Sequence, residues 1–483
     1  MTFLFVLTAL ALSALIALRW PKTALLAAVF FIPWAGLDVD IGLRVTAYLV
    51  FIIPIFTIVL LRMSGSHGWR NGFSSLGVLN LLILYAIIWS LAQIPFLPEA
   101  SVAGGGMRQP AIRSAVQIVM FLITLSPLLV VPALIRNAPD LVRLGKVYLT
   151  STVVLALIGW VQLAIWFATG SDPLPVGFFD NLLGGSAANR SGMFSYEGQL
   201  IYRMSSFGGE PRDMGASLAV ALLLLQSGIR MKASLKLPIW YFLFASMVAT
   251  FSTMALLAWF CASAVQFFTT SDLRLKLHTQ MLRIKRSVLF ALLVALFAFV
   301  VVGFSGHSNL LTNLVELRTV DRITENKSAY LEDFNAGITD FLLDQPLFSI
   351  TGVGLGNVHL YANNYLTADV QDYAADTAFV AKSFSLKWIS ELGLLSFLIF
   401  SYWVVAALRK AASLERRVME LAAARGNIAK FGLPLFAFVL VSSYVIPQFF
   451  IMLGCALAIC SIARREISLV KANHAIKAEA RHF

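Results

Sequence analysis

The residues best suited to chemistry in this chain are two arginines and a carboxylate that stand beside glycines, directly before a long apolar segment. Arg203 and Arg212 flank a Gly-Gly-Glu-Pro sequence whose carboxylate is Glu210. An arginine fork binds two phosphate oxygens at once and stays charged at any working pH. Pro211 and Arg212 would fall in the first turn of the next helix, whose N-terminal dipole also favours an anion. We therefore predict a phosphate site here; the alternatives are lipid head groups as partners, or ion pairs with Glu210 and Asp213.

A second group of candidates lies in a later polar stretch. Arg318 and Arg322 precede an amphipathic helix that we expect to lie on the membrane, to cover a cavity or to pack on neighbouring helices. The apolar face of that helix consists of Leu331, Phe334, Ile338, Phe341 and Leu342. The segment Gly352 to Asn357 has three alternating glycines but no preceding strand, so we interpret it as a tight turn offering amides to an anion, and not as a nucleotide loop. His359 follows it and is a candidate proton acceptor.

Three further charged residues surround the start of the next apolar segment. They are Lys382, Lys387 and Glu391. Charged groups at that depth usually have a partner or a task, so we predict that these residues contact substrate. No group of histidines and carboxylates with metal-ligand spacing accompanies the arginines, and we therefore expect neither a metal nor a cofactor.

Helices that cross a membrane must position these residues. Of the 483 residues, 59% are hydrophobic and 13% are charged, against about a quarter charged in soluble domains. Apolar stretches of roughly 17 to 25 residues match the hydrocarbon core, and the alternation typical of barrels is missing. We predict an all-α polytopic membrane protein with twelve or thirteen transmembrane helices, depending on whether the shorter stretch Thr23 to Leu37 crosses. The other spans are expected at about Phe3 to Leu18, Val45 to Leu61, Leu76 to Leu97, Ala115 to Ile135, Val147 to Thr169, Met214 to Gly228, Leu237 to Phe268 (two spans), Ser287 to Ser305, Phe384 to Leu408 and Phe431 to Ala463 (two spans).

The distribution of charge predicts the orientation. The net charge is +12; 26 of the 37 Lys and Arg residues lie in alternate loops, whereas 18 of the 25 acids lie in the other loops. This positive-inside pattern places the basic loops and the C-terminus in the cytoplasm, and it accounts for the charge without nucleic acid as a partner. The resulting division is 1–169 N-terminal helices, 170–213 first external loop, 214–305 middle helices, 306–383 large external loop with the amphipathic helix, 384–463 C-terminal helices and 464–483 cytoplasmic tail.

Three stretches together resemble the superfamily of O-antigen polymerases and O-antigen ligases (Wzy and WaaL type), polytopic enzymes that transfer lipid-linked glycans on the periplasmic face of the bacterial inner membrane. They are Arg203 to Gly215, Arg322 to Asn357 and Ser383 to Leu395. The resemblance implies a C-type glycosyltransferase-like fold with two long periplasmic loops. It also implies a polymerase of O-antigen or exopolysaccharide that uses undecaprenyl-diphosphate-linked oligosaccharides as donor and acceptor. Membrane lipids and a chain-length regulator or export machinery are the other partners that it suggests.

In such a reaction the leaving diphosphate gains negative charge, which fixed cations can stabilise. We predict that Arg203 and Arg212, together with Arg318 or Arg322, grip this diphosphate without a metal. Glu210 is our first choice as the group that activates or orients the acceptor hydroxyl, and His359 is the second. Attack opposite the diphosphate would invert the anomeric centre.

Two positions differ from the ligases of this superfamily. Ligases commonly have a histidine nine residues before the glutamate of the third stretch, where this chain has Lys382. They also often have a Ser-Arg pair in the middle spans, where this chain reads Phe251-Ser-Thr-Met254. A polymerase therefore fits better, and an O-antigen ligase is the alternative. A lipid-linked glycan flippase and a non-catalytic export subunit are alternatives from other classes, although we find no internal repeat of the kind that transporters have.

Overall fold

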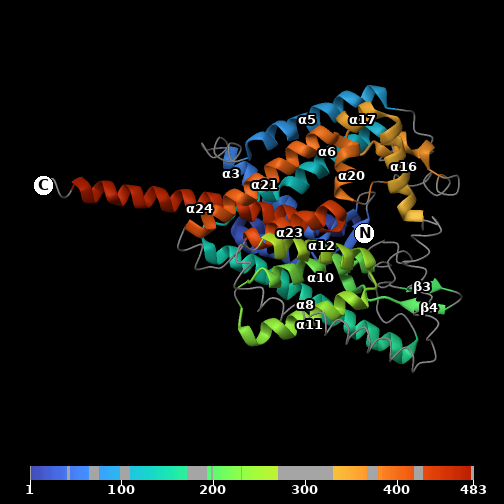
Figure 1. The fold of residues 1–483 in the computed structure, drawn as a ribbon, viewed down its shortest axis with the longest axis horizontal. Coiled ribbons are helices and arrows are strands. Elements are labelled where there is room, and N and C mark those ends of the chain that lie inside the picture. Colours follow the sequence, from blue (N-terminus) through green and yellow to red (C-terminus); the bar gives the residue numbers. More distant parts are fainter. Residues whose placement is uncertain are drawn as a thin grey trace.

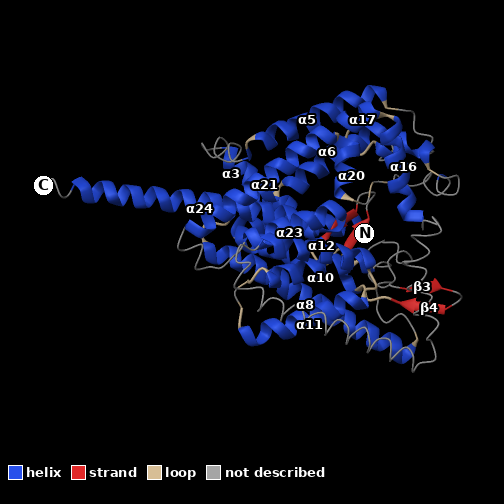
Figure 2. Cartoon of the chain, viewed as in Figure 1, coloured by secondary structure: helices blue, strands red, loops and turns tan. Residues whose placement is uncertain are grey.

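The computed structural model describes residues 2–40, 44–64, 76–97, 109–170, 193–196, 199–229, 231–269, 330–366, 371, 379, 381, 383–417 and 428–479. Within them the chain is mostly helical (Figure 2), which confirms the predicted helical class. Two antiparallel hairpins depart from the all-α prediction: β1 (Asp38–Asp40) pairs with β2 (Arg44–Thr46), and β3 (Met193–Tyr196) pairs with β4 (Gln199–Tyr202). Strands of three or four residues are too short to give a recognisable alternating pattern in a sequence.

The N-terminal helices overlap the predicted apolar stretches, but α6 begins at Pro110 and not at Ala115, and α8 begins at Ala138 and not at Val147. They are α1 (Thr2–Arg19), α2 (Pro21–Phe31), α3 (Ala47–Ser64), α5 (Val78–Gln93) with the short 3-10 turn η1 (Ile94–Phe96), α6 (Pro110–Leu125), α7 (Pro127–Leu134) and α8 (Ala138–Thr169). Prolines occupy the first position of α2, α6 and α7, where a missing N–H costs nothing. At the start of α8 the side chain of Asn137 accepts a hydrogen bond from the Asp140 amide over 3.0 Å.

The middle of the chain contains the most deeply buried helix. After the 3-10 turn η4 (Ser206–Gly208) come α10 (Pro211–Gln226), α11 (Ala233–Ala249) and α12 (Thr253–Thr269). Every residue of α10 from Met214 to Leu225 is buried, and α8, α11, α12 and α23 (Ile428–Val441) contact it. A helix that is apolar on all faces belongs in the interior, so the N-terminal end of α10 is a fixed point of the bundle.

The described part of the large loop has a small core of its own. The helices of this part are α16 (Tyr330–Asp344), α17 (Pro346–Thr351), α18 (Val358–Ala362) and the 3-10 turn η6 (Asn363–Tyr365). The next helix, α20 (Phe384–Leu392), packs against their core through Leu386 and Ile389. The predicted amphipathic helix is confirmed as α16, whose buried residues Phe334, Ile338, Phe341 and Leu342 pack on Val353 and Val358. Figure 1 shows α16, α17 and α20 grouped at one end of the bundle.

The C-terminal helices differ from the prediction in one place. The expected single span from Phe384 to Leu408 is wrong, because Gly393 separates α20 from α21 (Leu394–Arg417). Gly393 has a φ of 85°, and a Cβ there would lie 1.9 Å from the carbonyl oxygen of Ile350. After α23, the 3-10 turn η7 (Ser443–Val445) leads to α24 (Ile446–Glu479), which runs past the bundle so that the predicted tail is helical up to Glu479 (Figure 1).

Several helices are suited to a membrane. Among the described residues, five helical stretches are long and apolar enough to cross: Val78–Phe96, Pro110–Leu134, Ala138–Thr169, Leu394–Glu415 and Ser443–Glu466. Shorter apolar helices lie at Phe3–Arg19, Pro21–Phe31, Ala47–Met63, Ser234–Ala249, Thr253–Phe268 and Lys430–Val441. The protein is therefore a helical membrane protein, while the predicted total of twelve or thirteen spans stays a prediction because Ser287 to Ser305 lies outside the described residues.

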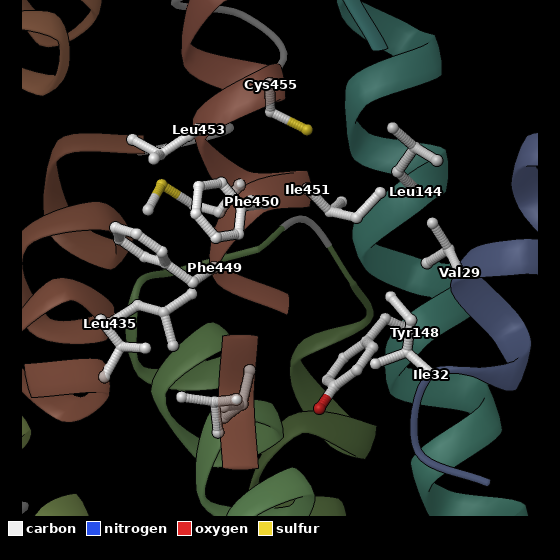
Figure 3. Close-up of a cluster of buried hydrophobic side chains, with 14 of the residues drawn as sticks. Val29, Ile32, Leu144, Tyr148, Leu435, Phe449, Phe450, Ile451, Leu453 and Cys455 are labelled. Atoms are coloured by element: carbon white, nitrogen blue, oxygen red, sulfur yellow. The ribbon is translucent and has the colours of Figure 1, made fainter. Parts of the chain in front are cut away.

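The main core lies where α2, α8 and α24 meet. Figure 3 shows Val29, Leu144, Tyr148, Ile451 and neighbouring aromatic residues filling this region. A cavity of about 90 Å³ lies among these helices and α10, with an almost entirely apolar lining. The hydroxyl of Tyr148 donates to the carbonyl of Ser217 in α10 over 3.0 Å, so this buried hydroxyl is satisfied.

Candidate functional site

The first part of the candidate site is the N-terminal end of α10. Glu210 precedes the helix and Pro211 is its first residue, so Arg212 stands in the first turn, as the sequence predicted. The guanidinium of Arg212 forms an ion pair with the Glu210 carboxylate and lies 5.0 Å from the centre of the Tyr444 ring. The side chain of Arg212 is 29% exposed and that of Glu210 is 39% exposed. The pair is thus held in place yet can be reached from outside.

The turn before α10 is held by close backbone approach. The amide of Gly36 donates to the carbonyl of Phe207 over 3.0 Å, and Trp34 stacks on the Phe207 ring at 5.8 Å. Gly209 has a φ of 90°, and Ser206 adopts a φ of 51° although it is not a glycine. In the part of the chain that the structure describes, the buried hydroxyl of Ser206 has no hydrogen-bond partner. Strained backbone and unsatisfied polar groups of this kind gather at functional sites.

A buried amide on α8 faces the same region. Gln162 is fully buried, and neither its side-chain oxygen nor its nitrogen has a hydrogen-bond partner among the described residues. Gln162 shares a helix face with Gly159 and Trp166, which lie three and four residues away. A Cβ on Gly159 would lie 2.7 Å from the Met204 side chain, and Trp166 stacks on Tyr202 at 5.3 Å. Gln162 therefore faces the segment that leads into the turn, and no signal in the sequence marked it.

The structure describes two of the four arginines of the predicted clamp, which stays a prediction. Arg203 is half-buried between β4 and η4, where the neighbouring Met204 amide donates to the carbonyl of Ala249 over 3.1 Å. Arg203 and Arg212 thus stand at the two ends of the segment that enters α10. Arg318 and Arg322 lie outside the described residues, so their convergence with this segment stays a prediction.

The second part of the candidate site is the glycine turn from Gly352 to Asn357. The amides of Val353 and Gly354 donate to the backbone carbonyls of Ser390 and Glu391 over 3.0 and 2.9 Å. The amide of Leu355 donates to Ser90 Oγ over 2.9 Å, and that of Gly356 donates to Glu391 Oε1 over 3.3 Å. Within the turn, the Asn357 amide donates to the Gly354 carbonyl over 3.4 Å. The interpretation of this turn as a source of free amides for an anion is therefore wrong. The amides are used to hold the turn against α5 and α20.

Side chains from α5 and α6 hold the same turn. The donors and acceptors are Tyr85 Oη to Thr351 O at 2.6 Å, Trp89 Nε1 to Gly352 O at 3.1 Å, Arg113 Nε to Gly356 O at 3.0 Å, and Ser114 Oγ to Asn357 Oδ1 at 2.8 Å. A Cβ on Gly356 would lie 2.4 Å from the Gln117 side chain, so only glycine allows this approach to α6. The large loop is thus fastened to the spans through this turn.

Charged groups gather around the turn. Glu391 is buried, and desolvation raises the pKa of its carboxyl, although Lys387, the Gly356 amide and Arg113 oppose this shift. Burial lowers the pKa of His359 to about 4, with a further contribution from the positive charge of Arg113. His359 is therefore neutral near pH 7, and its buried Nδ1 has no hydrogen-bond partner within the described ranges.

The structure thus brings together His359, Lys387 and Glu391, which the sequence named separately, and adds Arg113. The sequence missed Arg113 because the predicted span began at Ala115, which left Arg113 as one of several basic loop residues. Lys382 lies outside the described residues. Among the described residues, no three His, Cys, Asp or Glu side chains gather as a metal ion would need.

The two parts of the site meet the same break between α23 and α24. Ser385 in α20 donates to the carbonyl of Leu440 at the end of α23 over 2.8 Å. Four residues later, Tyr444 in η7 covers Arg212. The predicted division of the long apolar block from Phe431 to Ala463 is therefore confirmed, and the break serves to connect α20 with the start of α10.

Comparison with known proteins adds no family. No protein-family model matches the chain, and no curated protein matches its sequence. The fold defines the class as a helical membrane protein. Any closer assignment depends on the residues of the site.

Proposed function

We propose that this protein is a polysaccharide polymerase, a membrane glycosyltransferase of the bacterial inner membrane that joins undecaprenyl-diphosphate-linked glycans on the periplasmic face. The observation that carries the proposal is the position of Arg212. It is a partly exposed arginine in the first turn of a buried helix, with a carboxylate and an aromatic ring fixing its guanidinium. A cation at the end of a helix dipole, inside an apolar bundle, is suited to an anionic head group.

The ion pair with Glu210 suggests how the site changes when substrate binds. Glu210 compensates the charge of Arg212, which would otherwise be partly desolvated without this partner. A diphosphate would compete with Glu210 for the guanidinium, because arginine binds phosphate oxygens bidentately. The released carboxylate could then accept a hydrogen bond from an acceptor hydroxyl beside the diphosphate.

The proposed reaction is a single displacement. The acceptor hydroxyl oxygen forms a bond to the anomeric carbon of the donor, while the bond from that carbon to the diphosphate oxygen breaks. The bonding electron pair leaves with the lipid diphosphate, and the hydroxyl proton goes to Glu210, with His359 as the second candidate. Arg203 and Arg212 would stabilise the negative charge that builds on the leaving oxygen. Because the hydroxyl attacks opposite the leaving group, the anomeric configuration would invert.

The test compares Arg212→Gln with Arg212→Lys in purified protein supplied with lipid-linked repeat units. We expect Arg212→Gln to slow chain growth about a hundredfold, the usual effect of removing one donor to a developing oxyanion. Lysine keeps the positive charge but lacks the planar fork of arginine, so the rate of Arg212→Lys should lie between those of the unaltered protein and Arg212→Gln. Arg143→Gln is the matched control, because Arg143 is an exposed arginine near the other end of α8 from the site. Chain growth at the normal rate in Arg212→Gln would reject the proposal.

The product separates the alternatives in the same assay. Chains of increasing length identify a polymerase, whereas a single transfer to a different acceptor identifies a ligase. No new glycosidic bond, together with movement of the lipid-linked glycan across the bilayer, identifies a flippase. A protein that tolerates loss of every loop arginine would be a non-catalytic subunit.

A further inference from the structure

Among the described residues around the glycine turn, the cations outnumber the acids. Arg113 and Lys387 are both half-buried cations, and both interact electrostatically with the carboxylate of Glu391. Glu391 is 5% exposed and its Oε1 already accepts a hydrogen bond from the Gly356 amide. Two cations beside one carboxylate leave an excess positive charge, which is costly in a partly desolvated site unless an anion compensates it.

Donor groups at this cluster also remain uncommitted. Arg113 uses its Nε for the Gly356 carbonyl, which fixes the plane of the guanidinium. No hydrogen bond or ion pair of the two terminal nitrogens of Arg113 occurs in the part of the chain that the structure describes. Those nitrogens form the open edge of a fork that matches two phosphate oxygens. His359 lies beside the same arginine, and its buried Nδ1 has no hydrogen-bond partner among the residues that the structure describes.

The cluster is rigid before any ligand binds. The turn is fastened to α5 through Ser90, Tyr85 and Trp89, and to α6 through Ser114. Arg113 lies in the first turn of α6, at the start of a stretch long and apolar enough to cross a membrane. A fixed cation at the end of a span is placed where the head group of a membrane lipid lies.

We propose that Arg113 and Lys387 form a second anion site, which binds the diphosphate of the acceptor lipid while the site at Arg212 binds that of the donor. This inference rests on the proposed function, because a polymerase joins two lipid-linked glycans and must hold two diphosphates. The helix α20 that carries Lys387 contacts the end of α23 through Ser385, and Arg212 contacts Tyr444 in the turn that follows α23.

The test counts diphosphate sites in the full-length protein in detergent. Calorimetric titration with geranyl diphosphate should give two sites in the unaltered protein, and one site in either Arg113→Gln or Arg212→Gln. In Arg113→Gln, diphosphate should bind at least about tenfold more weakly to the substituted site, as expected for loss of a charge-assisted hydrogen bond, so that the titration reports the other site alone. A parallel titration with inorganic pyrophosphate distinguishes a lipid site from a general phosphate site, since the lipid site should bind the geranyl compound more tightly.

Ser114→Ala is the matched control, because it removes the neighbouring bond to the same turn without changing the charge. Two sites in Ser114→Ala and one in Arg113→Gln, at similar unfolding temperatures, would support the inference, and Arg113→Lys should restore part of the affinity. An unchanged stoichiometry in Arg113→Gln would overturn the second site. Loss of a site in Arg113→Gln but not in Arg212→Gln would instead reject the proposed donor site and leave the second site standing.

Discussion

His359 makes a specific prediction about pH and stability. Burial and the nearby charge of Arg113 lower the pKa of its imidazole from an ordinary value near 6.5 to about 4. Between these two values the unfolded chain binds a proton that the folded protein excludes. Stability must therefore fall as the pH drops from about 6.5 to about 4, and it must be unaffected by this group at higher pH.

The size of the effect follows from the two pKa values. At about pH 5 nearly every unfolded chain would carry the proton, whereas about a tenth of the folded protein would. The resulting loss of stability is about 2 kcal/mol, approaching about 3 kcal/mol below pH 4. His359→Gln has no group that titrates in this range, so the variant should lose less stability on acidification than the unaltered protein does.

Thermal unfolding in detergent at about pH 7 and about pH 5 measures this difference. The same substitution at His482, close to the C-terminus, is the control for a histidine distant from the turn in sequence. We expect the drop in unfolding temperature on acidification to be smaller in His359→Gln and unchanged in His482→Gln. Equal drops in all three proteins would refute the conclusion that the fold keeps His359 neutral.

Three further changes test other parts of the structure. Gly393→Ala should lower the free energy of unfolding by more than about 1 kcal/mol, because Gly393 has a positive φ and a Cβ there would clash with Ile350. Gly170 also has a positive φ but lies in open space, so Gly170→Ala should cost less in the same unfolding assay. Gln162→Leu should raise the free energy of unfolding by about 1 to 3 kcal/mol, and with it the unfolding temperature, because it removes a buried amide that has no hydrogen-bond partner among the described residues. A lower unfolding temperature would mean that the amide makes a stabilising hydrogen bond. Glu210→Gln should lower kcat by about a hundredfold if the carboxylate takes the proton, and it should lower KM, because the neutral amide no longer competes with the diphosphate for Arg212; a normal kcat would assign the proton transfer elsewhere.

Much of the fold could be predicted because the signals are local. The apolar block from Leu237 to Phe268 divides into α11 and α12, and the block from Phe431 to Ala463 divides into α23 and α24, as expected from the length of one crossing. The amphipathic spacing that forms α16 and the proline at the start of α10 were also visible. Each of these features depends on residues within a few turns of one another.

The errors arise where distant segments meet. The glycine turn has a sequence suited to binding an anion, yet Ser90 and Glu391, which are far away in the chain, occupy its amides. Gly393 ends a helix that its apolar neighbours would have continued, because the carbonyl of Ile350 leaves no room for a side chain. Propensity cannot anticipate such contacts, since they depend on packing.

The sequence by itself determined the helical membrane class and the place of Arg212 at the start of a helix, because both follow from local apolar length and from the chemistry of proline and arginine. Only the tertiary structure decided which charges share a site. It placed Arg113 beside His359 and Tyr444 over Arg212, through contacts between segments hundreds of residues apart. Burial also decides which of these groups stay charged, because a low dielectric penalises an ion unless its partners are brought to it.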